Sequence, residues 1–358
     1  MPVIDADTHV DETEATWEFV QPGEEALKPQ ATAPANLDPN RRPTRYWTID
    51  GRRQQRFTRD DERTRTTVQM RELLDVSERL RAMDALGTDV QVIYPTMFLA
   101  EGTDKPEVEL AVRRSYNRWL ADRCSKSGGR LRWVCLPPYR SMDKALEELR
   151  FAKDHGACGI LKKGNQEADH WFSDEYFHPL YEESERLDLP ICVHTGSGVP
   201  DYSPTREFLF SAFLRFTSPV PNAFEAAIIF GLTRKFAKLR FGFIEAGASW
   251  LPFLIYHLRR RQERLADGTF GRPEYELPSD VMRHHRLYVT CQVDEDLPYL
   301  LQSTGEDNIL VGSDFTHGDS AQELEFRRIL LERADRGEIS HEAVRKITED
   351  NPKRFYGL

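Results

Sequence analysis

Residues 3–12 read VIDADTHVDE, in which a short apolar run leads directly into acidic residues and a histidine. Short β-branched or aromatic runs recur along the chain, and a stretch of helical length follows each of them. Apolar strands that alternate with helices indicate a parallel sheet covered on both faces, and eight such units predict an α/β fold, the (β/α)8 TIM barrel. The eight runs are residues 3–4, 90–93, 132–136, 159–161, 191–193, 240–244, 287–289 and 309–311.

The segments between these runs predict helices and two insertions. Residues 77–87, 142–156 and 174–188 have the amphipathic spacing of helices, and Gly87 and Gly156 are placed as C-terminal caps. The proline-rich residues 28–67 and 196–222 interrupt the pattern shortly after strand ends, where loops cover the active sites of barrels. We therefore expect a single domain over residues 1–358 with lid insertions at about 28–67 and 196–222.

Composition and charge limit the classes of partner. The chain has 358 residues, a formal net charge of −10 and 39% hydrophobic residues, which is enough for a large core. A net-negative protein is not drawn to nucleic acid or to an anionic membrane. We expect a small-molecule substrate, and self-association into a homo-oligomer is compatible with the sequence.

The amino terminus and the cysteines point to a cytoplasmic protein. Residues 1–14 turn acidic at once and lack the apolar core of a signal peptide, and no apolar run reaches the length of about 18 residues that a membrane helix needs. The five cysteines are scattered without a CxxC pair, so we expect reduced, buried thiols.

Polar residues stand where several of the predicted strands end. In a parallel barrel these ends form the active-site face. Charges gathered in one apolar mouth repel each other unless a metal ion or a substrate compensates them, so the pattern predicts a site that binds a metal ion or a charged substrate. The residues in question are His9, Asp11 and Glu12 after the first strand, Lys162 and Lys163 after the fourth, His194 after the fifth, Glu245 after the sixth, and Asp314 and His317 after the eighth.

Several motifs resemble a known family. They are DADTHVDE, RLRAMDALGTDVQVIYPT, SYNRWLAD, PICVHTG, KLRFGFIEAGASWLP, GSDFTHGD and EDNPKRFYGL, which together span the chain. The chain resembles the amidohydrolase superfamily, and within it the branch that includes the aminocarboxymuconate semialdehyde and resorcylate decarboxylases. The resemblance implies a barrel with a metal at its mouth, held by His9, His194 and Asp314.

Two positions depart from the pattern of that family. The usual first motif is His-x-His; we place Asp11 at its second position with Glu12 just beyond, and we expect Glu12 to replace the imidazole as ligand. Asp5 and Asp7 are expected either to orient His9 or to cap the strand. Glu245 stands where the decarboxylases have a histidine that acts as acid or base, which argues against simple decarboxylation.

The resemblance to binuclear members implies a ligand set for two ions. That set is His9, Glu12, Lys163 or Lys162 as a bridging carboxylated lysine, His194, Glu245 and Asp314. Imidazoles and carboxylates suit first-row cations, and we expect two ions, with iron preferred over zinc or manganese. A lysine that merely pairs with a carboxylate is an equal alternative. His317 is expected to be a catalytic or substrate-contacting residue, with a surface histidine as the alternative.

Three reactions can use such a site. One enzyme of this fold, a nonheme diiron monooxygenase of platensimycin and platencin biosynthesis, is similar in kind to this chain. We therefore favour a diiron monooxygenase that activates O2 to hydroxylate a bulky apolar organic acid or its thioester, with Glu245, Asp314 and His317 as catalytic residues. The alternatives are a metal-dependent hydrolase of an ester, lactone or amide, a non-oxidative decarboxylase of a small organic acid and, more remotely, an inactive binding scaffold.

Overall fold

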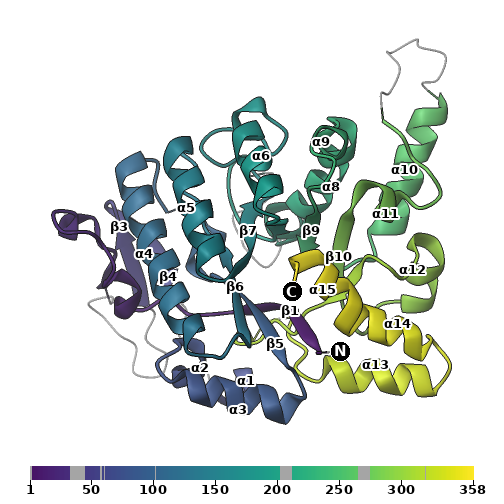
Figure 1. Cartoon of the computed structure of the whole chain (residues 1–358), viewed down its shortest axis with the longest axis horizontal. Helices are drawn as coiled ribbons and strands as arrows, with labels where there is room; N and C mark the ends of the chain where they lie inside the picture. The colour runs from purple at the N-terminus through teal and green to yellow at the C-terminus, as the bar shows by residue number, and fades with distance from the viewer. Residues whose placement is uncertain are drawn as a thin grey trace.

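Eight parallel strands form one sheet that wraps into a barrel surrounded by helices (Figure 1). The computed structural model describes residues 2–32, 45–56, 59, 61–100, 102–201, 212–264, 275–318 and 320–358. Each predicted apolar run overlaps one of the eight strands, so the prediction of an α/β barrel of the (β/α)8 type is confirmed. In sheet order the strands are β1 (Ile4–His9), β5 (Val90–Tyr94), β6 (Leu131–Cys135), β7 (Ala157–Lys163), β8 (Ile191–His194), β9 (Phe241–Ile244), β10 (Leu287–Cys291) and β11 (Ile309–Val311).

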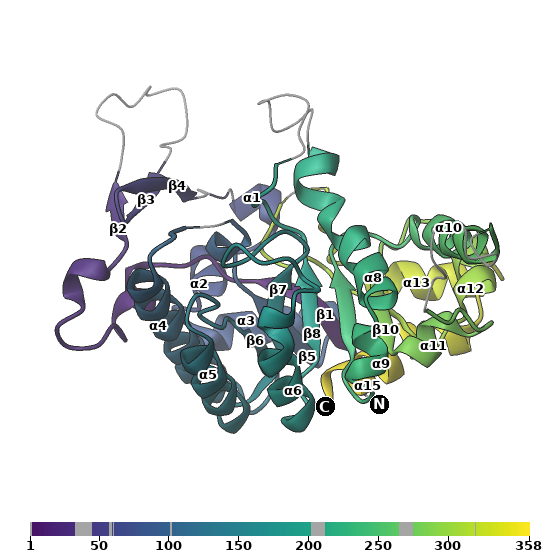
Figure 2. The same cartoon turned by 90° about the horizontal axis from the view of Figure 1, so that it is seen from above.

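The barrel closes between its first strand and the segment that follows its last one. Thr8 in β1 forms a parallel bridge with Phe315, and the His9 amide donates to the Phe315 carbonyl at 2.9 Å. The Asp314 amide donates to the Asp7 carbonyl at 3.0 Å. Closure therefore brings the segments that follow the first and last strands of the barrel together at the carboxyl ends of the strands. The two termini of the chain also lie near each other in both views (Figures 1 and 2).

The helices form the outer layer, and local sequence signals set their ends. Asp75 caps the helix α3 (Val76–Leu86) by accepting from the Ser77 amide at 2.8 Å, and Gly87 ends it with a left-handed φ of 68°, as predicted. In α5 (Met142–Asp154) the buried residues include Ala145, Leu149 and Ala152, the face expected from the spacing. The longer helices are α3 (Val76–Leu86), α4 (Pro106–Ser125), α5 (Met142–Asp154), α6 (His178–Arg186), α8 (Pro219–Ile229), α10 (Leu251–Arg264), α12 (Leu297–Thr304) and α13 (Phe326–Asp335).

Short helical turns complete the connections. They are the α-helices α1 (Asp61–Thr64), α2 (Val68–Arg71), α9 (Leu232–Lys235), α11 (Val281–His285), α14 (His341–Arg345) and α15 (Asn351–Tyr356), the 3-10 turns η1 (Glu14–Trp17), η2 (Glu25–Leu27), η3 (Met97–Leu99) and η4 (Glu175–Phe177), and the π-helical turns η5 (Phe213–Thr217) and η6 (Lys346–Asp350). None of the helices in the described ranges is long and apolar enough to cross a membrane. All five cysteines are buried and free, as predicted.

The first predicted lid contains secondary structure that the sequence analysis did not anticipate. Strands β2 (Gln30–Thr32), β3 (Arg45–Ile49) and β4 (Arg52–Arg56) form an antiparallel sheet at one side of the barrel (Figure 2). Trp47 of β3 packs edge-on against Trp17 with ring centroids 5.6 Å apart, which attaches this sheet to the body. Residues 33–44, 57, 58 and 60 of the first lid and 202–211 of the second lie outside the described residues.

Candidate metal centre

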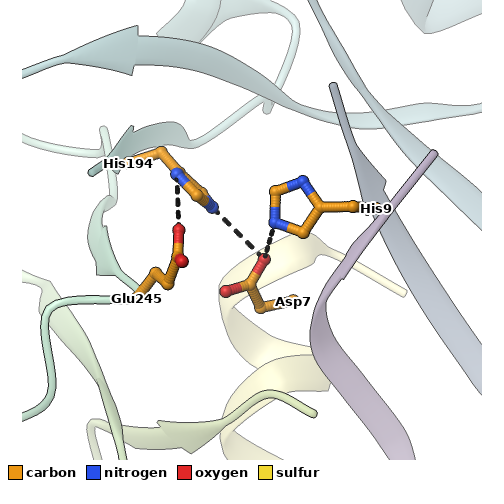
Figure 3. A group of neighbouring side chains, drawn as sticks. All are labelled: Asp7, His9, His194 and Glu245. Atoms are coloured by element: carbon orange, nitrogen blue, oxygen red, sulfur yellow. Dashed lines mark hydrogen bonds and ion pairs between the residues drawn. The ribbon is translucent and has the colours of Figure 1, made fainter. Parts of the chain in front are cut away.

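Strand β1 carries two of the side chains at the centre of the site. Side chains two residues apart on a strand share a face, and Asp7 and His9 both reach the barrel interior, where each is buried. Asp7 Oδ1 lies 3.3 Å from His9 Nε2 and 3.4 Å from His194 Nε2, so this one oxygen faces two imidazoles (Figure 3).

Both imidazoles are held in one tautomer by carbonyl groups. His194 is the last residue of β8, and its Nδ1 lies 2.9 Å from the Thr195 carbonyl; His9 Nδ1 lies 2.9 Å from the Pro95 carbonyl. A carbonyl oxygen only accepts, so both Nδ1 atoms carry the hydrogen and donate it. In its neutral form each ring therefore directs its Nε2 lone pair at Asp7. In metal sites, a hydrogen bond from the ring nitrogen that does not bind the metal usually orients the histidine.

This arrangement fits a divalent cation. His9 Nε2 is buried and makes no hydrogen bond to any described residue, although carboxylate oxygens of Asp7 and Asp314 lie 3.3 and 3.4 Å away. Lone pairs that converge on carboxylate oxygens need a positive charge between them. Imidazole nitrogens and carboxylate oxygens are ligands that Mn(II), Fe(II) and Zn(II) accept.

Two further carboxylates reach the site because the backbone turns sharply after the strand ends. Glu245 and Asp314 have left-handed φ values of 64° and 50°, a backbone conformation that residues other than glycine adopt rarely. Ile244 pairs with His194 in the sheet and so shares its face; simple alternation would turn Glu245 away. Instead Glu245 Oε2 accepts from Thr195 Oγ1 at 2.6 Å and lies 3.2 Å from His194 Nδ1.

His317 joins the site through Asp314. Its Nδ1 lies 2.9 Å from Asp314 Oδ1, and its ring stacks on that of His9 with centroids 3.6 Å apart. Potential ligand atoms within 4.8 Å of one another form two groups, which share His9. One consists of Asp7, His9, His194 and Glu245, and the other of His9, Asp314 and His317.

The electrostatics of the buried site depend on its imidazoles. Burial alone would raise the pKa of Asp7, but His194 and His9 outweigh it and lower that pKa below its usual range. Burial lowers the pKa of His9 and, more strongly, that of His317. Burial also opposes charge on His194, yet Glu245 and Asp7 raise its pKa to about 9. A cation bound here would replace a proton on His194.

Glu12 is not in either group of potential ligands. Its Oε1 accepts from the Thr96 amide at 3.0 Å and its Oε2 from the Met97 amide at 2.9 Å, while burial raises its pKa to about 8. Asp11 lies beside Arg59, 3.0 Å away, and Arg71, 3.5 Å away. Ligation by Glu12 stays a prediction; in this structure its carboxylate holds the turn after β5.

The two lysines of β7 point to opposite faces. Lys163 pairs with His194 across the sheet and shares its face, and its Nζ donates to the Ser197 carbonyl at 3.1 Å. Lys162 points outward, where its Nζ lies 3.0 Å from Glu167 and 3.4 Å from the centre of the Phe177 ring. Lys162 therefore matches the carboxylate-paired alternative, whereas a carboxylated Lys163 stays a prediction.

The sequence analysis gave Asp7 only an orienting or capping role. The sequence did contain a signal that Asp7 could be a ligand. Asp7 and His9 are two residues apart, and that spacing places two side chains on the same face of a strand. Asp7 and His9 thus have the spacing of a His-x-His pair with a carboxylate at its first position, whereas the sequence analysis placed His9 first and Asp11 second. Asp5, two residues earlier, accepts instead from the Ser313 amide at 2.8 Å.

Comparison with known proteins places the chain among amidohydrolases. The family model described as Amidohydrolase matches residues 4–358. A gamma-resorcylate decarboxylase of Rhizobium sp. (strain MTP-10005) is 29% identical over 138 residues, 37% of this chain and 42% of that enzyme. The chain thus matches about two fifths of the length of this curated relative.

Solved structures share the fold. An amidohydrolase from Mycobacterium avium subsp. paratuberculosis K-10 superposes with a TM-score of 0.79 at 18% identity, covering 100% of this chain and 98% of that one. The 5-carboxyvanillate decarboxylase of Novosphingobium aromaticivorans DSM 12444, complexed with manganese and a substituted nitrobenzoic acid, has a TM-score of 0.65 at 19% identity, covering 79% and 81%.

Proposed function

Because this chain belongs to the amidohydrolase family, and is a metal-dependent enzyme of that fold, we propose that it is a non-oxidative decarboxylase of a small phenolic carboxylic acid. The observation that carries the proposal is the local similarity to the gamma-resorcylate decarboxylase, at 29% identity over 138 residues. This reaction was the alternative in the sequence analysis, which ranked the diiron monooxygenase first.

The side chains that would hold divalent metal at this site, as one ion or two, are Asp7, His9, His194 and Asp314. A divalent cation bound by them supplies a Lewis acid that polarises substrate oxygens and stabilises negative charge during the reaction. The Thr195 and Pro95 carbonyls keep the imidazole Nε2 atoms directed at that position. Burial of the four side chains excludes water, which strengthens each of these interactions.

A guanidinium near the site suits an anionic substrate. Arg59 pairs with Asp11 at 3.0 Å, its side chain is 12% exposed, and its charge acts on His317. A planar guanidinium binds a carboxylate with two parallel hydrogen bonds. We assign to Arg59 the role of binding the substrate carboxylate at the mouth of the barrel. The ion pair with Asp11 holds the guanidinium group of Arg59 in place.

The reaction needs a proton at the carbon that loses CO2. Asp314 is placed to supply it, because the left-handed backbone aims its carboxyl group into the site and its Oδ1 already faces His9 and His317. In this proposal the Oδ2 atom of Asp314 passes a proton to the ring carbon. The C–C bond then breaks, its electron pair returns to the ring, CO2 leaves, and water restores the proton to Asp314.

The proposal is tested with manganese-loaded protein and a panel of hydroxylated benzoates. We expect one CO2 released per substrate consumed, one deuterium at the vacated carbon in D2O, and no uptake of O2. Consumption of O2 with a hydroxylated product, or turnover of esters and lactones without CO2 release, would overturn it.

A second candidate is the diiron monooxygenase predicted from the sequence. The observation in its favour is that the potential ligand atoms form two groups, which is the arrangement that two ions need. The same assay separates the two reactions, because an oxygenase loaded with Fe(II) consumes O2 in the presence of a reductant and keeps the substrate's carboxylate.

A further inference from the structure

We propose that His317 is a metal ligand through Nδ1, and that with Asp314 and His9 it forms a cation position separate from the one at Asp7 and His194. Thr96 is the residue that positions it. The inference rests on the metal-dependent function proposed above, but not on which reaction the enzyme performs. The ion bound at this position would be a first-row divalent cation.

The tautomer of His317 follows from the hydrogen bonds of Thr96. The Thr96 hydroxyl lies 2.7 Å from the Val10 carbonyl and 2.9 Å from His317 Nε2. A hydroxyl has one hydrogen, and the carbonyl can only accept, so Thr96 donates to Val10. His317 Nε2 must then carry a hydrogen and donate it to Thr96. The neutral ring presents its Nδ1 lone pair at the other end.

That lone pair points at a carboxylate oxygen. His317 Nδ1 lies 2.9 Å from Asp314 Oδ1, and His9 Nε2 lies 3.4 Å from the same oxygen. His317 is buried and stacked on His9, so neither ring has room to turn away. A single proton can join only one nitrogen to the oxygen, whereas one cation satisfies all three atoms. The donor set is therefore that of a metal position.

Thr96 is held rigidly enough to set this geometry. Its amide donates to Glu12 Oε1, which fixes the turn after β5 against the segment after β1. Glu12, Thr96 and His317 thus form a chain of hydrogen bonds that ends at Asp314. Groups that orient a ligating histidine typically change metal affinity by about 10- to 100-fold when they are removed.

The experiment measures metal binding without any substrate. The full chain is freed of metal, titrated with Co(II), and followed by its visible spectrum and by elemental analysis after gel filtration. We expect two Co(II) per chain in the wild type and in His341→Gln, a matched control because His341 is an exposed histidine of helix α14 that pairs with Asp335. We expect one in His317→Gln, with the affinity for that remaining ion unchanged.

The hydroxyl variants separate positioning from folding. Thr96→Val should weaken the second ion by about 10- to 100-fold, and Thr96→Ser, which keeps the hydroxyl, should restore it. If His317→Gln does not fold, the affinities of Thr96→Val and Thr96→Ser for the second ion test the proposal instead. Two ions in His317→Gln, one ion in the wild type, or equal affinity in the valine and serine variants would overturn the inference. Because no turnover is measured, loss of the proposed decarboxylase activity would leave these outcomes intact.

Discussion

The backbone amide of Asp314 donates a hydrogen bond to the carbonyl of Asp7 at 3.0 Å, so the barrel closes between two residues whose side chains both belong to the site. The same bond that completes the fold therefore sets the distance between the first and last strand ends. Loosening of the closure would also separate the carboxylates that face His9. Stability of the barrel and affinity for metal are in this way linked at one place.

Asp7 is the carboxylate of the first strand that faces the imidazoles, whereas the sequence analysis weighed only Asp11 and Glu12 as ligands from this segment. We expect Asp7→Asn to lower metal affinity at least 10-fold, because Asp7 Oδ1 faces both His9 and His194. Asp11→Asn is the matched control and should retain full metal content, since Asp11 pairs with Arg59 and Arg71. Elemental analysis after dialysis checks both; equal loss in the two variants would contradict the assignment.

Lys162 should be structural rather than a ligand. Its ammonium group is fully buried against Glu167, so Lys162→Met leaves a buried carboxylate without its cation and should cost about 3–5 kcal/mol in the free energy of unfolding. The double variant Lys162→Met with Glu167→Gln should recover much of that loss. Chemical denaturation measures the energies.

Metal content provides the second readout for this lysine. The folded Lys162→Met protein should bind as much metal as the wild type, because Lys162 points away from His194. A drop in metal content with folding intact would show that the lysine acts at the site.

Glu12 should make the stability of the metal-free protein depend on pH. Burial raises its pKa from 4.5 to about 8, so the folded state binds a proton that the unfolded state has released. Its contribution is fully present below about pH 4.5 and is lost as the pH rises through 8, with a slope of at most about 1.4 kcal/mol per pH unit.

The variant Glu12→Gln isolates this contribution. It mimics the protonated acid at every pH, so its unfolding free energy should fall less steeply than that of the wild type between pH 5 and 8. Denaturation at several pH values with a chelator present checks this. Parallel curves for the two proteins would rule out a raised pKa at Glu12.

Arg59 should govern substrate binding more than the chemical step. We expect Arg59→Ala to raise KM for a phenolic carboxylate by about 10- to 100-fold with a smaller change in kcat, because a charged hydrogen bond to the substrate is lost. Arg52→Ala is the control: Arg52 pairs with Asp104 and its side chain is 51% exposed. A change confined to kcat would argue that Arg59 acts elsewhere.

Much of the fold could be predicted from local patterns. The apolar run before His194 and the one before Glu245 form neighbouring strands, because a run of buried residues between polar ends needs a sheet covered on both sides. The antiparallel sheet around Trp47 was missed, since its strands are rich in arginine and proline lies nearby. Such strands depend on contacts with distant residues, here Trp17, rather than on their own apolar pattern.

The sequence by itself determined the eight strands, their order and the presence of His9, His194, Glu245, Asp314 and His317 at the mouth, because strand burial and the parallel arrangement place those residues at one end of the barrel. Only the tertiary structure decided which atoms meet. Left-handed φ values re-aim Glu245 and Asp314, and closure of the barrel sets Asp314 beside His9, whereas amides of the next strand's turn engage Glu12. These outcomes depend on contacts between segments far apart in the chain, which periodicity along one strand does not encode.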